Sequence, residues 1–146
     1  IGKTIIKAVN KAKDAGYVMS CMVILGLGGR KYSKEHIKGT AEVISACSPH
    51  YVGALTLYLD NGIKQEFIDK YEGEFIKITD DESLEELYDL INQIETKEEI
   101  IFRVNHGSNA YTVKGTFPQD KQEMLEKVEW MKEHPEIVRP QGIRGF

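Results

Sequence analysis

The chain has 146 residues, of which 41% are hydrophobic and 29% are charged, and its formal net charge is -4. These values are typical of one soluble globular domain that can bury a real core. With a pI near 5.6, the chain has no basic field, so nucleic-acid binding is not expected. No apolar run approaches the roughly 20 residues that cross a bilayer, and residues 1–13 are amphipathic rather than signal-like, so we expect no membrane contact and a cytoplasmic protein.

The residues that most often bind metals give no metal-site signal. Cys21 and Cys47 lie far apart in the sequence and form neither a disulfide framework nor a C-x-x-C pair, so we interpret them as buried, reduced thiols. No pair of histidines or acids has metal-ligand spacing. We interpret His36, His50 and His134 as surface residues rather than ligands.

The first half of the chain alternates predicted helices and strands. A helix is expected over residues 3–15, ending at Gly16, and a helix that Ser33 caps is expected over 34–47. Residues 18–27 are almost uninterrupted apolar, which predicts a strand covered on both faces, as in a parallel sheet. A second strand is expected over 51–59. Two strands joined by a helix predict a right-handed βαβ unit.

The second half continues with a short helix over 64–71 and an extended segment at 74–78. Thr79 and Glu82 have capping-box spacing, which predicts a helix through residue 96. Its predicted apolar face carries Leu84, Leu87, Leu90, Ile91 and Ile94, and its first acids, residues 80–86, are interpreted as a solvated helix start. A strand is expected over 98–104, a loop over 111–117, and a final helix over about 120–134 that carries Trp130 in the core or at an interface. The proline- and glycine-rich tail should be irregular.

Glycines end the first predicted strand, at Gly26, Gly28 and Gly29. Loops at the carboxyl ends of parallel strands form the ligand crevice, and glycine lets a backbone approach a ligand closely. The dinucleotide fingerprint fails, because its last glycine would fall at Lys31, and no Walker A sequence follows. Two interpretations stay open: a ligand-binding turn, and a turn whose glycines only allow a tight connection.

A second polar cluster, Asn105-His106-Gly107-Ser108-Asn109, directly follows the strand over 98–104. Its side chains could hydrogen-bond a substrate, or they could satisfy a turn by themselves. In the second strand, Thr56 and Tyr58 alternate with leucines, so either could line a pocket or belong to a half-buried strand.

These segments together resemble a known family. The stretch VILGLGG followed by S-K-E-H, the helix TAEVISACSP and the strand YVGALTLYLDNG resemble the fifth strand, fifth helix and sixth strand of radical S-adenosylmethionine enzymes. The likeness is to a coproporphyrinogen-dehydrogenase-like group of Fe-S oxidoreductases. It extends to the F-R-x-N-H-x-S-N stretch at residues 102–109 and the K-G-T-x-P-x-D-K stretch at residues 114–121.

The resemblance implies an α/β fold, namely the C-terminal portion of a partial TIM barrel. Residues 1–79 would supply βα units with parallel strands, and residues 80–146 a mainly helical extension with one strand. It further implies a cofactor segment and a substrate segment. The cofactor residues are Gly26, Leu27, Gly28, Gly29, Leu57, Tyr58 and Leu59. The substrate residues are Asn105, His106, Ser108 and Asn109. Many relatives place an acid where Arg30 stands.

The cofactors implied by the resemblance are S-adenosylmethionine and a 4Fe-4S cluster in a full-length oxidoreductase. The family binds the cluster through C-x-x-x-C-x-x-C, which this chain lacks, so the chain is expected to be an inactive fragment that holds neither group alone. The catalytic residues and the substrate stay unknown. Exposed barrel edges would favour self-association. The alternative is a stand-alone α/β module that binds a small ligand or a protein without catalysis.

Overall fold

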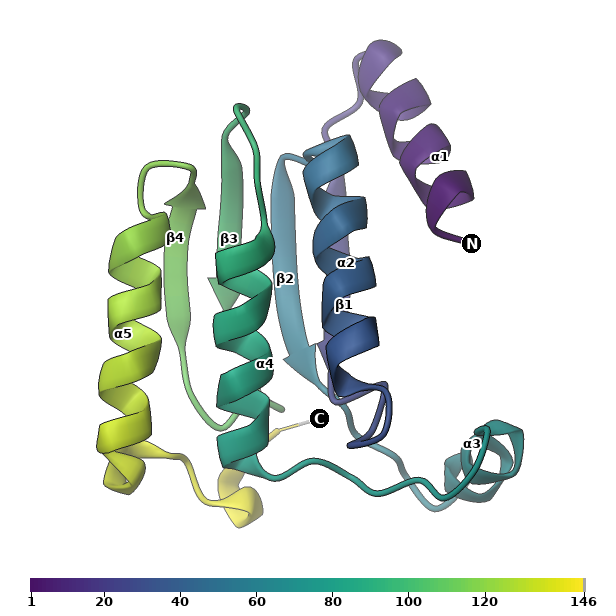
Figure 1. The fold of residues 1–146 in the computed structure, drawn as a ribbon, viewed down its shortest axis with the longest axis vertical. Coiled ribbons are helices and arrows are strands. Elements are labelled where there is room, and N and C mark those ends of the chain that lie inside the picture. Colours follow the sequence, from purple (N-terminus) through teal and green to yellow (C-terminus); the bar gives the residue numbers. More distant parts are fainter. Residues whose placement is uncertain (146) are drawn as a thin grey trace.

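The computed structural model describes residues 1–145, which form one open, four-stranded sheet (Figure 1). Its strands are β1 (Ser20–Leu25), β2 (Tyr51–Thr56), β3 (Ile100–Val104) and β4 (Val113–Phe117), in that spatial order. The first three strands are parallel, with Ser20 opposite Tyr51 and Tyr51 opposite Ile101. Strand β4 runs antiparallel to β3. The expected α/β class with parallel strands is therefore confirmed.

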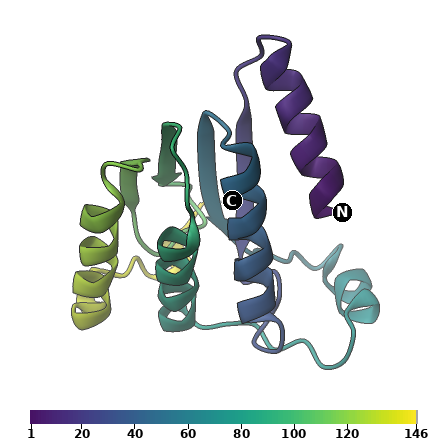
Figure 2. The same ribbon diagram turned by 45° about the horizontal axis from the view of Figure 1, so that its top comes forward.

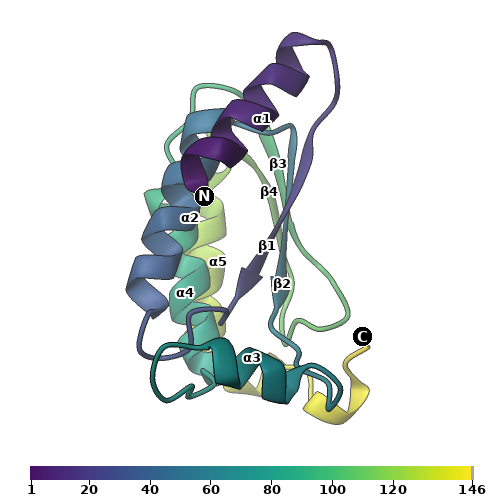
Figure 3. The same ribbon diagram turned by 90° about the vertical axis from the view of Figure 1, so that its right-hand side faces the viewer.

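Three long helices cover one face of this sheet, as Figures 2 and 3 show. They are α2 (Ser33–Cys47), α4 (Asp80–Gln93) and α5 (Lys121–Glu133). Helix α1 (Gly2–Asp14) lies beside α2, and the short α3 (Lys64–Lys70) lies below the ends of the strands. Two 3-10 turns, Pro135–Ile137 and Gln141–Ile143, occupy the tail. Among residues 1–145, no helix combines the length and hydropathy that a membrane span requires.

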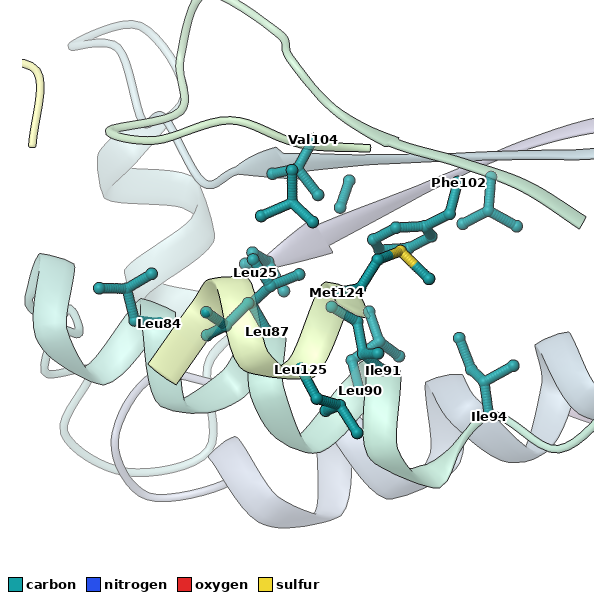
Figure 4. Packing of buried hydrophobic residues seen from close by; sticks show 14 of the residues in the cluster. Leu25, Leu84, Leu87, Leu90, Ile91, Ile94, Phe102, Val104, Met124 and Leu125 are labelled. Atoms are coloured by element: carbon teal, nitrogen blue, oxygen red, sulfur yellow. The ribbon is translucent and has the colours of Figure 1, made fainter. Parts of the chain in front are cut away.

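The core lies between the sheet and the helix layer, and α4 is at its centre (Figure 4). Leu87, Leu90 and Ile91 of α4 have no exposed surface, and they face Phe102 and Val104 of β3. The predicted apolar face of this helix is confirmed, although the helix ends at Gln93 rather than at residue 96. Burying one such side chain contributes about 1.5–3 kcal/mol, so the apolar side of α4 contributes substantially to stability.

The opposite face of the sheet has no helical cover within the described residues (Figure 3). Met22 is 62% exposed, Ile24 38% and Tyr51 43%, and all three point to this face. The prediction that the first strand is covered on both faces is therefore wrong. Both faces of β1 carry apolar side chains, which explains its apolar run. Only the face toward α2 and α4 is packed.

The segment expected as a loop over 111–117 instead forms β4, so the second half contributes two strands rather than one. Tyr111, Val113 and Phe117 are buried, and the residues between them are more exposed. This period of two is a strand signal that Gly115 and the following proline obscured. Because β3 and β4 pair in the same sheet as β1 and β2, residues 1–79 and 80–146 share one core.

The β3 core position gives the first test. Phe102 has no exposed surface and its ring meets that of Phe117 edge-on at 5.6 Å, whereas its neighbour Ile101 points to the uncovered face and is only partly buried. We expect Phe102→Ala to lower the free energy of unfolding by about 3–5 kcal/mol. Ile101→Ala is the matched control and should cost much less. Urea denaturation measures both, and equal losses would contradict the one-sided core.

Candidate functional site

The three predicted site segments meet at one edge of the sheet. Residues 26–29 follow β1, residues 57–59 follow β2 and residues 105–109 follow β3, and parallel strands place all three connections at the carboxyl edge. The amide of Leu57 donates to the Leu25 carbonyl at 2.9 Å, and the amide of Thr56 donates to Ser108 Oγ at 3.3 Å. The segments are therefore direct neighbours in the order of their strands.

The glycines of the first turn are required by contacts within the chain. Gly26 and Gly29 have φ of +82° and +57°, which side chains rarely adopt. A Cβ at Gly28 would lie 2.7 Å from the carbonyl oxygen of Tyr32, and one at Gly29 would lie 3.0 Å from the ring of Phe75. Close packing of the turn against its own helix and against residues 75–78 accounts for these glycines without a ligand.

The backbone donors of the turn are also largely engaged. The amide of Gly26 donates to Glu86 Oε2 at 2.6 Å, that of Gly29 to the Gly26 carbonyl, and that of Arg30 to the Ile76 carbonyl at 2.9 Å. An anion-binding turn needs such donors to point at the ligand. These three amides cannot do so here, which agrees with the failed phosphate fingerprints.

Glu86 of α4 is the site residue that the sequence analysis missed. Its side chain is buried, and its two oxygens accept hydrogen bonds from the Gly26 amide and from Ser33 Oγ at 2.7 Å. The prediction that residues 80–86 are a solvated helix start is therefore wrong for Glu86. Ser33 is not the helix cap either: Tyr32 occupies that position, and the Ser33 hydroxyl fastens the turn to α4 instead.

A lobe of aromatic residues covers the outer side of the glycine turn. Tyr71 donates its hydroxyl proton to the Gly28 carbonyl at 2.7 Å, and its ring lies 5.0 Å from that of Phe75 and 5.6 Å from that of Tyr32. Beside the turn, this lobe leaves a shallow, mostly apolar hollow of ≈ 390 Å³. Its lining residues are Leu27, Ile63, Glu66, Phe67, Lys70 and Tyr71.

Residues 57–59 differ in burial, because one lies in the core and the others are partly or largely exposed. Leu57 is buried against the turn, with its Cβ 3.7 Å from the Cβ position of Gly26, whereas Tyr58 is 48% exposed and Leu59 is half-buried. Leu27, which is 38% exposed, follows the neighbouring strand. Leu27 and Tyr58 are thus the predicted cofactor residues whose side chains have the most accessible surface.

The second cluster, residues 105–109, is a braced turn with two exposed members. Asn109 has no exposed surface; its amide nitrogen donates to the Ala54 carbonyl at 2.8 Å, and its Oδ1 accepts from Thr56 at 3.0 Å. Ser108 bonds His106 Nδ1 at 2.8 Å. Asn105 and His106 are exposed, so they are the members that can reach a ligand.

Hydrogen bonds from the C-terminal tail hold this cluster in place. Arg139 donates to the carbonyls of Asn109 at 2.6 Å and His106 at 3.2 Å. Arg144 forms a two-pronged ion pair with Asp80 at the start of α4, at 2.9 and 2.7 Å. A Cβ at Gly107 would lie 2.7 Å from the Gly145 carbonyl, so the tail crosses directly over the loop.

Burial shifts the acid–base behaviour of nearby groups that could otherwise react. Tyr111 bonds Ser83 at 2.6 Å, and burial raises its pKa well above the ordinary tyrosine range, which keeps the phenol neutral. Burial likewise raises the pKa of the Cys47 thiol, with a further rise from nearby Cys21. Burial also raises the pKa of Cys21. Both thiols are therefore poor nucleophiles at neutral pH.

The remaining histidines form structural contacts. His36 Nε2 donates to the Ile24 carbonyl at 2.9 Å, and His50 Nδ1 accepts from the Met19 amide at 3.0 Å. His134 stacks on Trp130 at 4.1 Å between ring centroids. Trp130 is 41% exposed, so it is a surface residue and not a core residue. No group of three or more metal-ligating side chains occurs within the described part of the chain.

Comparison with known proteins adds no further constraint on the site. No protein family, curated protein or solved structure matches the chain.

The buried Glu86 carboxylate gives a test of how the glycine turn is held. Glu86→Ala leaves the Gly26 amide and the Ser33 hydroxyl without their acceptor, and each orphaned buried group costs about 1–3 kcal/mol. We expect a clear loss of thermal stability and faster amide exchange at residues 26–33. Glu85→Ala is the control, because that side chain is 62% exposed in its ion pair with Lys132. Equal effects would contradict the anchoring role.

The contact between the tail and α4 gives a third test. In Arg144→Ala the carboxylate of Asp80 loses its partner and the tail loses its anchor, so we expect amide exchange at residues 105–110 to accelerate and stability to fall by about 1–3 kcal/mol. Arg30→Ala, which breaks the exposed pair with Glu82, should leave that loop unchanged. A protected 105–110 loop in the Arg144 variant would show that the tail does not brace it.

Proposed function

We propose that this chain is the C-terminal part of a radical S-adenosylmethionine Fe-S oxidoreductase and supplies part of its cofactor and substrate pocket. The observation that supports the proposal is the one-sided sheet. Parallel strands carry helices on one face only, and apolar side chains stand uncovered on the other. A β/α barrel has this arrangement, because its helices form the outer ring and the inner faces of its strands pack together.

The carboxyl edge would be the catalytic end of such a barrel. The glycine turn, residues 57–59 and the 105–109 cluster all lie there, as ligand-binding loops of β/α folds do. Residues of this chain would have separate roles. Leu27 and Tyr58 would offer apolar surface to the adenine side of the cofactor, and Asn105 and His106 would offer hydrogen bonds to the substrate.

The two implied groups fit these residues differently. For the iron–sulfur cluster the fit fails: the chain has two cysteines, both with raised pKa, and the described residues contain no group of three or more side chains placed to hold a metal ion. For S-adenosylmethionine the fit is partial, because the hollow beside Leu27 is apolar while the amides of Gly26, Gly29 and Arg30 are engaged. In the family, the cofactor supplies a 5'-deoxyadenosyl radical when bound, and we expect no such chemistry from this chain alone.

The proposal is tested on the gene. We expect the reading frame upstream of Ile1 to encode a C-x-x-x-C-x-x-C segment. The protein with that segment, reconstituted with iron and sulfide without oxygen and reduced with dithionite, should cleave S-adenosylmethionine reductively to methionine and 5'-deoxyadenosine. A variant with the three cysteines replaced by alanine is the control. Leu27→Asp in the complete protein should weaken cofactor binding. A reading frame without such a segment would overturn the proposal.

A stand-alone binding module is the second candidate, and the bracing of the loops favours it. The glycine turn and the 105–109 cluster are held by Glu86, Arg139 and Asn109 without any ligand, as an independent domain requires. The two candidates differ in solution behaviour. An independent domain should stay monomeric in light scattering, whereas a part of a barrel should associate through its uncovered face.

A further inference from the structure

Two positively charged side chains stand opposite each other on the uncovered face of the sheet. Arg103 of β3 is the direct partner of Lys114 of β4. The amide of Ile101 donates to the His50 carbonyl at 2.9 Å, on the β2 side, so the odd-numbered residues of β3 exchange no hydrogen bonds with β4. Arg103 and Lys114 are therefore a non-hydrogen-bonded pair, whose Cα atoms are about 4.5 Å apart. Like charges at such a position destabilise a sheet.

No acidic side chain offsets this repulsion. Alternate residues of the four strands stand on the uncovered face, and Arg103 and Lys114 are the only charged ones among these strand residues. Neither of them forms an ion pair within residues 1–145. In the same row across the sheet, Met22 lies over Gly53, with its Sδ 2.8 Å from the Cβ position of the glycine. The surface beside the two cations is therefore apolar.

The guanidinium of Arg103 is fixed in place by one of its nitrogens. Its Nη1 donates to the carbonyls of Phe102 at 2.8 Å and Gly115 at 3.1 Å. The Nε and Nη2 groups, which form the side of the guanidinium next to its stem, have no hydrogen-bond partner among the described residues. Two parallel N–H groups of this kind match the two oxygens of a carboxylate or a phosphate. Their orientation is set before any ligand binds.

The charged pair borders a hollow of ≈ 680 Å³ at the β4 edge of the sheet, beside α5. On its strand wall, Asn105 and Thr112 join the two cations. The α5 wall carries Lys127 and two carboxylates, those of Glu123 and Glu126. Because both acids lie on α5, the positive charge of the hollow is concentrated on its strand wall.

We propose that Arg103 and Lys114 bind one oxyanion, a carboxylate or phosphate group of a small ligand, on the strand wall of this hollow. Arg103 Nε and Nη2 would donate to two of its oxygens, and the Lys114 ammonium would supply the second positive charge. Asn105 and Thr112 would offer further hydrogen bonds. An oxyanion between the two cations converts their repulsion into attraction, which no side chain on this face does.

The source of the oxyanion depends on the role of the chain. Asn105 is one of the substrate residues of the proposed function, so in that function the oxyanion would belong to the substrate. Only this assignment to the substrate rests on the proposed function. The oxyanion site itself rests on the contacts and charges of β3 and β4 and is equally available in a stand-alone module.

The test titrates the full chain with sodium phosphate and, separately, with sodium succinate. Sodium chloride at equal ionic strength is the reference, because it screens charges without offering a bidentate oxyanion. We expect saturable NMR shifts at the Arg103 Nε–H and the Lys114 amide, and a higher midpoint of thermal unfolding, with both oxyanions but not with chloride. The tighter of the two probes identifies the ligand as a phosphate or a carboxylate.

Four variants separate a site from general attraction. Lys114→Glu replaces the like charges by an ion pair, so the thermal midpoint should rise in dilute buffer while the phosphate response disappears. Arg103→Lys keeps the charge but loses the two parallel donors, so binding should weaken roughly tenfold. Glu123→Gln removes an acid from the hollow and should tighten binding. Lys38→Gln on α2, whose side chain is 71% exposed, is the control and should change nothing.

Two results would overturn the proposal. One is an equal response to chloride, which would show that phosphate acts only by screening. The other is phosphate binding that persists in both Lys114→Glu and Arg103→Lys. The outcome is separate from the search for a cysteine motif: a reading frame without that motif would remove the proposed function and leave the expected phosphate binding of this chain unchanged.

Discussion

One helix, α4, holds both the core and the carboxyl edge of the sheet. Its apolar side carries Leu87, Leu90 and Ile91 into the interior, and three polar side chains on its first two turns fasten the loops. Glu86 binds the glycine turn, Ser83 binds Tyr111 beyond the 105–109 cluster, and Asp80 binds Arg144 of the tail. Because all these anchors share one rigid element, the loops keep a fixed relation to one another and to the core.

The sequence predicted where α4 begins and which side chains form its apolar face, but not that Glu86 is buried. The capping box at Thr79 and Glu82 located the start of α4, and the leucine spacing located its buried side. Burial of Glu86 also had a signal: Ser83, Glu86, Leu87 and Leu90 have the spacing of one helical face. The acidic composition of the first turns outweighed that spacing, because acids at a helix start are usually solvated and favourable to the helix dipole.

What the sequence could not predict is which segment meets each glycine. The residues that crowd the turn, Phe75, Ile76 and Ile78, lie nearly fifty positions further along the chain, and a local motif contains no information about them. The same limit applies to the strand at 18–27, because an apolar run is compatible with two buried faces, while cover on each face depends on distant helices. The strand at 113–117, in contrast, had a local period-two signal and could have been predicted.

The exposed side chains of β1 and the glycine turn that follows it are held by different contacts. Met22 and Ile24 are exposed on the uncovered face, whereas the glycine turn two residues later is held by Glu86 from the opposite side of the sheet. Covering the exposed side chains of β1 therefore needs no rearrangement of the turn. Because Glu86 and Arg139 hold the glycine turn and the 105–109 cluster from within the chain, the loops and the apolar surface of β1 are held by separate sets of contacts.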